Sequence, residues 1–193
     1  LNVDDHRPER SISNLYRLNF LNLANVAYLV SRDRLTDESL EPILESDVVW
    51  NSLSAWQKVK QNLLDNFRGR SNLFIYRNKN VLPRFFSPTR VRLFDDGRSA
   101  LKAMAESSLD DLKKTLFVEE KEWPSGVSVD QQFERADIQL DKYESDRIKL
   151  SVNAHGPALL HIGNSFSPFW SAEIDGVKTR IFPVNHTFWG VIL

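Results

Sequence analysis

The sequence has no cysteine, so disulfide bonds, thiolate metal sites and cysteine nucleophiles are excluded. Its seven glycines are isolated, and they form neither a glycine-rich phosphate loop nor a glycine-flanked serine turn. The longest apolar stretch, residues 18–30, contains three asparagines and is too short and polar to span a bilayer. These absences leave few of the motif-bearing enzyme classes as options.

Charge of one sign is not in excess either. The formal net charge is −1, so we expect no general attraction to nucleic acid or to an anionic membrane. The chain is 41% hydrophobic and 26% charged, which is typical of a soluble globular protein, and its 193 residues suffice for a substantial core.

The first two thirds of the chain mix helical and extended patterns. Apolar residues at helical spacing predict helices over residues 12–23, from Ser54 to residue 67, and after Ser99. Short apolar runs predict strands at residues 26–30, 48–50, 73–76 and 85–94, the last interrupted at Pro88. We expect a short helical turn at residues 36–42, with Pro42 near its start, and an asparagine-rich turn at residues 78–80. Residues 107–126 fit either helix or strand.

After residue 126 the apolar residues alternate with polar ones, which indicates half-buried strands. Asp175-Gly176 joins two such runs and predicts a tight hairpin. We therefore predict an α+β fold, with a mixed α/β subdomain over residues 1–126 and an antiparallel, jelly-roll-like β-sandwich over residues 127–193. The chain starts at Leu1 and stops within an apolar run. We therefore expect a fragment whose sandwich lacks its last strands, with residues 188–193 as an exposed or intermolecularly paired edge.

Metal and catalytic sites are not indicated. The histidines are scattered without ligand spacing, so we predict no metal and no cofactor. His161 lies among apolar residues of a predicted strand, which favours a hydrogen-bonded core or surface histidine over a ligand. The adjacent carboxylates of Asp110 and Asp111 diverge on a helix, where they favour the positive end of its dipole. Accordingly, we name no catalytic residue.

An aromatic cluster near the C-terminus is more suggestive. It comprises Phe166, Phe169, Trp170, Phe188 and Trp189. Sugar rings stack their C–H faces on aromatic rings, so Trp170 and Trp189 are candidate carbohydrate contacts, with hydrogen bonds from the polar residues Asn164, Asn185 and His186. The alternative is that the rings fill the sandwich core, because aromatic side chains dominate buried area.

Five segments taken in order resemble one protein family. Residues 78–84 (N-K-N-V-L-P-R) resemble the N-x-N-x-L-P-R turn in the extracytoplasmic C-terminal regions of YfhO-like multipass membrane proteins, relatives of GT-C-type glycosyltransferases. Residues 25–30, 156–160, 168–176 and 185–191 are similar to further strands and a hairpin of those regions. One departure is Phe169, which stands where the family has glycine between proline and tryptophan.

The resemblance implies a parent protein in the bacterial cell membrane, with this region on its extracytoplasmic face. The parent's catalytic residues and lipid-linked sugar donor would belong to parts absent from this sequence. The expected partner is then a cell-envelope polysaccharide or glycolipid, recognised or oriented by a domain that is not catalytic alone. The alternative function is a structural or protein-interaction module without a ligand, and an autonomous glycoside hydrolase would need two carboxyl groups facing each other across a cleft.

Overall fold

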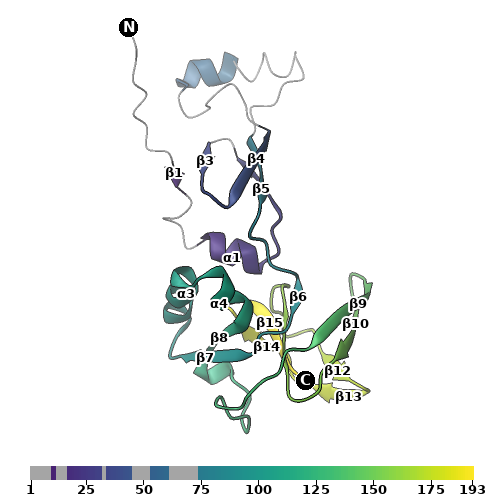
Figure 1. The fold of residues 1–193 in the computed structure, drawn as a ribbon. Helices are drawn as coiled ribbons and strands as arrows, with labels where there is room; N and C mark the ends of the chain where they lie inside the picture. The colour runs from purple at the N-terminus through teal and green to yellow at the C-terminus, as the bar shows by residue number, and fades with distance from the viewer. Residues whose placement is uncertain (1–9, 12–16, 32–33, 45–52, 61–73) are drawn as a thin grey trace. The chain divides into compact units, whose positions relative to one another are not determined.

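The computed structural model describes residues 10–11, 17–31, 34–44, 53–60 and 74–193 (Figure 1). These residues form several small sheets and short helices, which confirms the α+β class. The chain divides into two compact units, an N-terminal unit of residues 1–18 and 26–81 and a C-terminal unit of residues 19–25 and 82–193. The boundary predicted at residue 126 falls inside the C-terminal unit. Among the described residues, no helix has the length and apolarity needed to cross a membrane.

The N-terminal unit is built on an antiparallel sheet of three strands in the order β2 (Tyr28–Ser31), β5 (Phe74–Asn78) and β4 (Leu40–Leu44). A parallel pair, β1 (Arg10–Ser11) and β3 (Leu35–Thr36), lies in the same unit. The strands predicted at residues 26–30 and 73–76 are confirmed. Among the described residues of this unit, a small core consists of Leu40, Phe74 and Tyr76, with Leu18, Leu29 and Leu35 packed against it.

Pro42 corrects one sequence prediction. Instead of starting a helical turn, it lies inside strand β4, at the edge of the sheet. The pairing of β4 with β5 shifts register between Pro42 and Leu44, and proline is tolerated at edges and bulges because no interior ladder bond is lost. A turn does precede the strand, since the Ser39 amide donates to Asp37 Oδ1 over 2.8 Å.

A helix begins after Ser54, as predicted. Residues 55–60 are helical, and Ser54 and Gln57 form a reciprocal capping box, with 2.8 Å from the Ser54 amide to the Gln57 side chain. Trp56 and Val59 on this helix are exposed. The predicted continuation to residue 67, and the predicted strand at residues 48–50, lie outside the described residues.

The C-terminal unit is built on a four-stranded antiparallel sheet that is buried on both faces. Its order is β14 (Phe182–Val184), β15 (Phe188–Ile192), β11 (Leu159–Ile162) and β6 (Phe85–Phe86). Because side chains alternate along a strand, Leu159 and Phe188 enter one core while Leu160 and Trp189 enter another. The expectation of an exposed edge at residues 188–193 is wrong, since β15 pairs with a strand on either side.

One face of this sheet is covered by a strand–helix–helix–strand segment. It consists of β7 (Arg90–Phe94), α3 (Gly97–Glu106), α4 (Leu109–Lys114) and β8 (Thr115–Glu119), followed by the 3₁₀ turn η3 (Glu120–Glu122). β7 and β8 are parallel, and parallel neighbours need a long crossover, which the two helices supply. The ambiguous region from residue 107 is thus helix first and strand second. Asp110 and Asp111 lie in the first turn of α4, which confirms the predicted helix-dipole position.

The other face is covered by two hairpins. β9 (Asp137–Tyr143) pairs with β10 (Ile148–Asn153), and β12 (Ala172–Ile174) pairs with β13 (Val177–Thr179). Asp175 and Gly176 have φ of 51° and 82°, which confirms the predicted tight turn. The strands after residue 126 therefore lie in three sheets, one of which also contains β6.

The helix α1 (Arg17–Leu23) confirms the described part of the helix predicted over residues 12–23. It stops before Asn25, whose φ of 59° is left-handed, a conformation that asparagine tolerates. The Asn25 side chain donates to the Leu82 carbonyl over 2.7 Å, and the Leu82 amide donates to the Asn22 carbonyl over 3.0 Å. Both bonds lie within the C-terminal unit.

Candidate functional site

The loop of residues 163–171, which we name the aromatic loop, brings three of the predicted site residues together in the C-terminal unit. Trp189 of β15 is only 3% exposed, and its indole nitrogen donates to the Ser165 carbonyl over 2.8 Å. The Trp170 ring lies 4.9 Å from the Trp189 ring, centroid to centroid, and is partly buried. Trp189 therefore holds the loop from inside, and Trp170 packs against it.

Asn164 takes part in a polar cluster with two residues that the sequence did not indicate. Arg84 Nη1 donates to the Tyr143 hydroxyl over 2.8 Å, and the Arg84 guanidinium lies 5.3 Å from the Tyr143 ring centroid. Asn164 Nδ2 donates to the same hydroxyl over 3.2 Å. The Gly163 amide donates to the Arg84 carbonyl over 2.7 Å, which fixes the start of the loop beside this cluster. Tyr143 remains 45% exposed, so the cluster presents an aromatic ring and hydrogen-bonding groups to solvent.

Phe169 is the most exposed of the large apolar side chains described, at 95%. Its backbone is not left-handed, so a side chain at this position causes no backbone strain. The Trp170 amide donates to the Ser167 carbonyl over 3.3 Å, so the chain turns at this point. The aromatic loop thus presents a ring that contributes nothing to the core.

Asn185 does not lie with these residues. It is completely buried in the turn between β14 and β15, where its side-chain oxygen accepts from the Phe117 backbone amide over 2.9 Å and its backbone amide donates to the Phe117 carbonyl over 2.7 Å. Asn185 and His186 have φ of 49° and 76°. Asn185 therefore connects this turn to β8 instead of facing a ligand.

His186 is exposed and lines a different, very small cavity with Glu119 and Glu122. The volume of this cavity is about 10 Å³, enough for one water molecule and too small for a sugar ring. Glu119 lies 2.9 Å from the ammonium of Lys121 and raises its pKa, while Glu122 lies 3.7 Å from Arg180. Both carboxylates have cationic partners, so the cavity is a poor candidate for glycoside hydrolysis.

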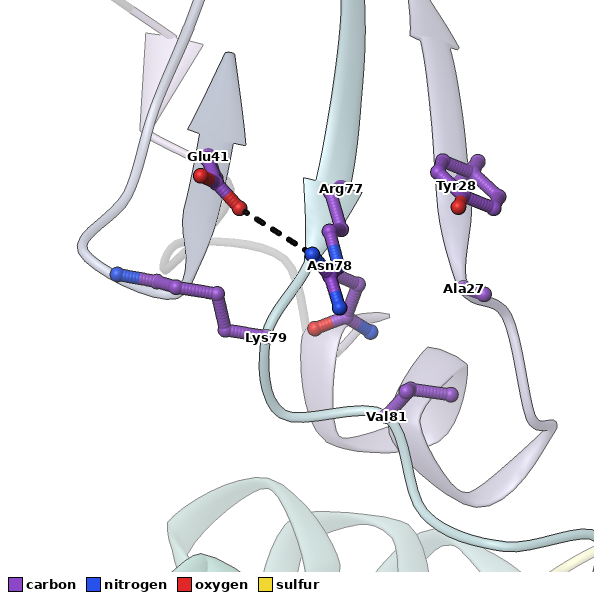
Figure 2. A pocket seen from close by; sticks show the side chains of 7 residues that line it. All are labelled: Ala27, Tyr28, Glu41, Arg77, Asn78, Lys79 and Val81. Atoms are coloured by element: carbon purple, nitrogen blue, oxygen red, sulfur yellow. Dashed lines mark ion pairs between the residues drawn. The ribbon is translucent and has the colours of Figure 1, made fainter. Parts of the chain in front are cut away.

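A larger cavity lies in the N-terminal unit (Figure 2). Its volume is about 420 Å³, and it is lined by Ala27, Tyr28, Glu41, Arg77, Asn78, Lys79 and Val81. Arg77 of the central strand is directly opposite Tyr28 of β2 on one side and Glu41 of β4 on the other. Arg77 Nη1 and Glu41 Oε2 are 4.0 Å apart, and both side chains are more than half exposed.

The turn at residues 78–80, which the sequence predicted, forms one end of this cavity. Asn78 Nδ2 donates to the Val26 carbonyl over 3.0 Å, and the Asn80 amide donates to Asn78 Oδ1 over 3.0 Å. The Lys79 amide donates to the Ser39 carbonyl over 2.9 Å. The cavity could not be predicted from local patterns, because its lining comes from three strands that are distant in the chain.

His161 is a buried ionisable group without a catalytic setting. It is completely buried between the rings of Phe86 and Phe188, whose centroids lie 4.4 Å and 5.4 Å from its own. Neither ring nitrogen has a hydrogen-bond partner among the described residues, and burial lowers the pKa to about 3. Of the core and surface positions that the sequence allowed, the structure has the core one, without the hydrogen-bond partners that were expected. Within the described part of the chain, no three metal-ligating side chains gather as a metal site.

The two carboxylates with lowered pKa values, Asp96 and Asp111, lie at the N-termini of helices. The pKa of Asp96 is lowered chiefly by the Ser99 backbone amide, and the pKa of Asp111 is lowered by the Ser108 hydroxyl and then by Arg90. Both act as capping or first-turn charges of α3 and α4, which stabilises those helices.

Comparison of the chain with protein-family models, with curated proteins and with solved structures finds no match. The evidence on function is therefore the geometry of the aromatic loop with its polar cluster and of the cavity in the N-terminal unit.

Proposed function

We propose that this chain is an extracytoplasmic domain of a bacterial multipass membrane protein of the YfhO-like, glycosyltransferase-related kind. In this proposal it recognises or orients a cell-envelope polysaccharide or glycolipid and performs no chemistry by itself. Five sequence segments in the order found in that family support the membrane origin. The proposed jelly-roll-like sandwich is supported by one feature, the packing of Ile138, Ile148 and Leu150 of the β9–β10 hairpin over the four-stranded sheet.

The observation that carries glycan recognition is the exposed ring of Phe169 on the aromatic loop, which also carries Asn164, the residue that hydrogen-bonds to the Arg84–Tyr143 pair. A sugar offers hydroxyl groups to the polar cluster and C–H faces to the rings. The amide and guanidinium groups can donate to hydroxyl oxygens, and the rings supply apolar contact at little cost in side-chain entropy. Asn185 and His186 have no part in this surface.

Titration of the chain with cell-envelope polysaccharides, after a glycan-array screen, tests the proposal. Phe169→Ala removes a ring that is almost fully solvated, so the fold should remain while saccharide affinity falls about three- to tenfold. Trp56→Ala is the matched control, because it removes another exposed aromatic ring from the N-terminal unit. If no saccharide binds, or if both variants bind as the parent does, the glycan role is wrong.

A structural or protein-interaction module is the second candidate. It is favoured by the Trp170–Trp189 packing and by the burial of Trp189, which turn two predicted sugar contacts inward. This candidate predicts that Trp170→Ala lowers thermal stability, whereas Phe169→Ala has no effect on any saccharide titration. The same experiment therefore separates the two functions.

A further inference from the structure

We propose that the cavity in the N-terminal unit is a binding site for an anionic group, a carboxylate or a phosphate, carried by a ligand with an apolar ring face. The anionic group lies at the Arg77 guanidinium, in a lining to which Lys79 contributes a second cation, and the ring face lies against Tyr28 (Figure 2). This inference is independent of the glycan surface on the aromatic loop, because the two sites share no residue.

The charges of the cavity lining favour an anion. The lining contains two cations, Arg77 and Lys79, and one carboxylate, Glu41, which leaves one net positive charge. The Arg77–Glu41 pair is loose, with 4.0 Å between the nearest charged atoms and with more than half of each side chain exposed, so it contributes little stability. No ion pair of Lys79 is found among the described residues. A carboxylate or phosphate can accept two parallel hydrogen bonds from a guanidinium, which the present Glu41 geometry does not provide.

The shape and walls of the cavity indicate the rest of the ligand. Its volume of about 420 Å³ falls within the roughly 300–1,000 Å³ of small-molecule sites. Tyr28, directly opposite Arg77 in the sheet, is 60% exposed, and Val30 continues the same face at 62%. Ala27 and Val81 complete the apolar part of the lining. A ring that carries its charge on one substituent can contact Tyr28 while the charge contacts Arg77.

The backbone around the cavity is already ordered. The turn of residues 78–80 is fixed by both ends of the Asn78 side chain, and the Lys79 amide is bonded to the Ser39 carbonyl. Arg77 stands on the central strand, which has hydrogen-bonded neighbours on both sides. Binding therefore requires the ordering of only a few side chains, which reduces its entropic cost.

Isothermal titration of the chain with four compounds tests the proposal and identifies the source of the charge. Glucuronate offers a carboxylate on a ring, glucose 6-phosphate offers a phosphate on a ring, inorganic phosphate lacks the ring, and glucose lacks the charge. We expect one or both charged sugars to bind with saturation, more tightly than inorganic phosphate, and glucose to bind at least tenfold more weakly. Preference for glucuronate identifies the ligand as a carboxylate, and preference for glucose 6-phosphate identifies it as a phosphate.

Three variants in the cavity lining should change anion affinity in opposite directions. Arg77→Gln and Lys79→Gln should each weaken binding at least about tenfold, because each removes a charged hydrogen-bond donor. Glu41→Gln should tighten binding, because it removes the anion that competes for Arg77. Arg98→Gln, an exposed cation in the C-terminal unit, is the matched control and should bind as the parent does.

Three results would overturn the site: no saturable binding of any anion, glucose binding as tight as that of the charged sugars, or equal weakening by Arg77→Gln and Arg98→Gln. Phe169→Ala separates this inference from the glycan proposal. It should leave anion binding unchanged, so either site can fail while the other stands.

Discussion

The sheets of the two units differ in how they use their faces. The N-terminal sheet β2-β5-β4 packs one face on a small core and exposes Tyr28, Val30 and Ile43. The C-terminal sheet β14-β15-β11-β6 is covered on both faces, by a strand–helix segment and by hairpins. Among the described residues, three buried residues form the N-terminal core, against twelve and four in the two C-terminal cores. Burial of apolar area is the main source of stability, so the C-terminal sheet is the stable framework and the N-terminal sheet offers the accessible surface.

The first test concerns the buried histidine of the C-terminal sheet, where we expect the largest effect. The pKa of His161 is about 3 in the folded chain and about 6.5 unfolded, so above pH 6.5 neither state is protonated. Between pH 6.5 and 3 the unfolded state binds a proton that the folded state does not. The free energy of unfolding therefore falls as pH falls, by about 1.4 kcal/mol per pH unit.

Urea unfolding of the parent chain and of His161→Leu between pH 7 and pH 3 measures this difference. The variant should lose less stability than the parent as pH decreases, and His155→Leu, at an exposed position, controls for the loss of a histidine elsewhere. Parallel profiles for the parent and His161→Leu would show that His161 is not a buried neutral group.

The second test concerns the close packing over Gly190 in β15. A Cβ at this position would clash with the Val184 side chain and approach the Phe182 ring to 3.0 Å. Gly190→Ala should lower the free energy of unfolding by about 3 kcal/mol, because the surrounding rings are fully packed. Gly176→Ala has open space around it and only a left-handed φ of 82° to accommodate, so about 1 kcal/mol is expected. Equal losses in chemical denaturation would mean that the Val184 and Phe182 side chains shift to accommodate the added Cβ, so that the packing over Gly190 is not close.

The third test makes the same substitution in both sheets and has the smallest expected effects. Val191 of β15 is 3% exposed and Val30 of β2 is 62% exposed. Val191→Ala should cost about 2 kcal/mol through lost burial and a residual cavity, while Val30→Ala should change stability by less than about 0.5 kcal/mol. Urea midpoints measure both. A cost of 2 kcal/mol at Val30 would show that the face of the N-terminal sheet is covered and that the comparison is wrong.

Several local features were predictable because neighbouring residues decide them. The Asp175-Gly176 hairpin, the turn at residues 78–80 and the helix after Ser54 each follow from side chains that satisfy or bend their own backbone. Alternation after residue 126 likewise identified strands, since a strand with one buried face has a period of two.

The pairing of strands was less predictable. Pro42 favours a turn in isolation, and only its position at the sheet edge makes a strand possible. The run of residues 188–193, which we predicted as an edge, contains an interior strand because β15 pairs with both β11 and β14. No local sequence pattern shows how many neighbours a strand has.

By itself, the sequence determined the absence of cysteine chemistry, the α+β class, the tight turns and the aromatic character of the C-terminal region. Only the tertiary structure decided where those aromatic and polar groups face. It placed Trp189 and Asn185 inside, left Phe169 outside, and brought together Arg84, Tyr143 and Asn164, as well as Glu41 and Arg77. Such groups meet through long-range pairing, so their position depends on packing that the spacing of residues along the chain does not record.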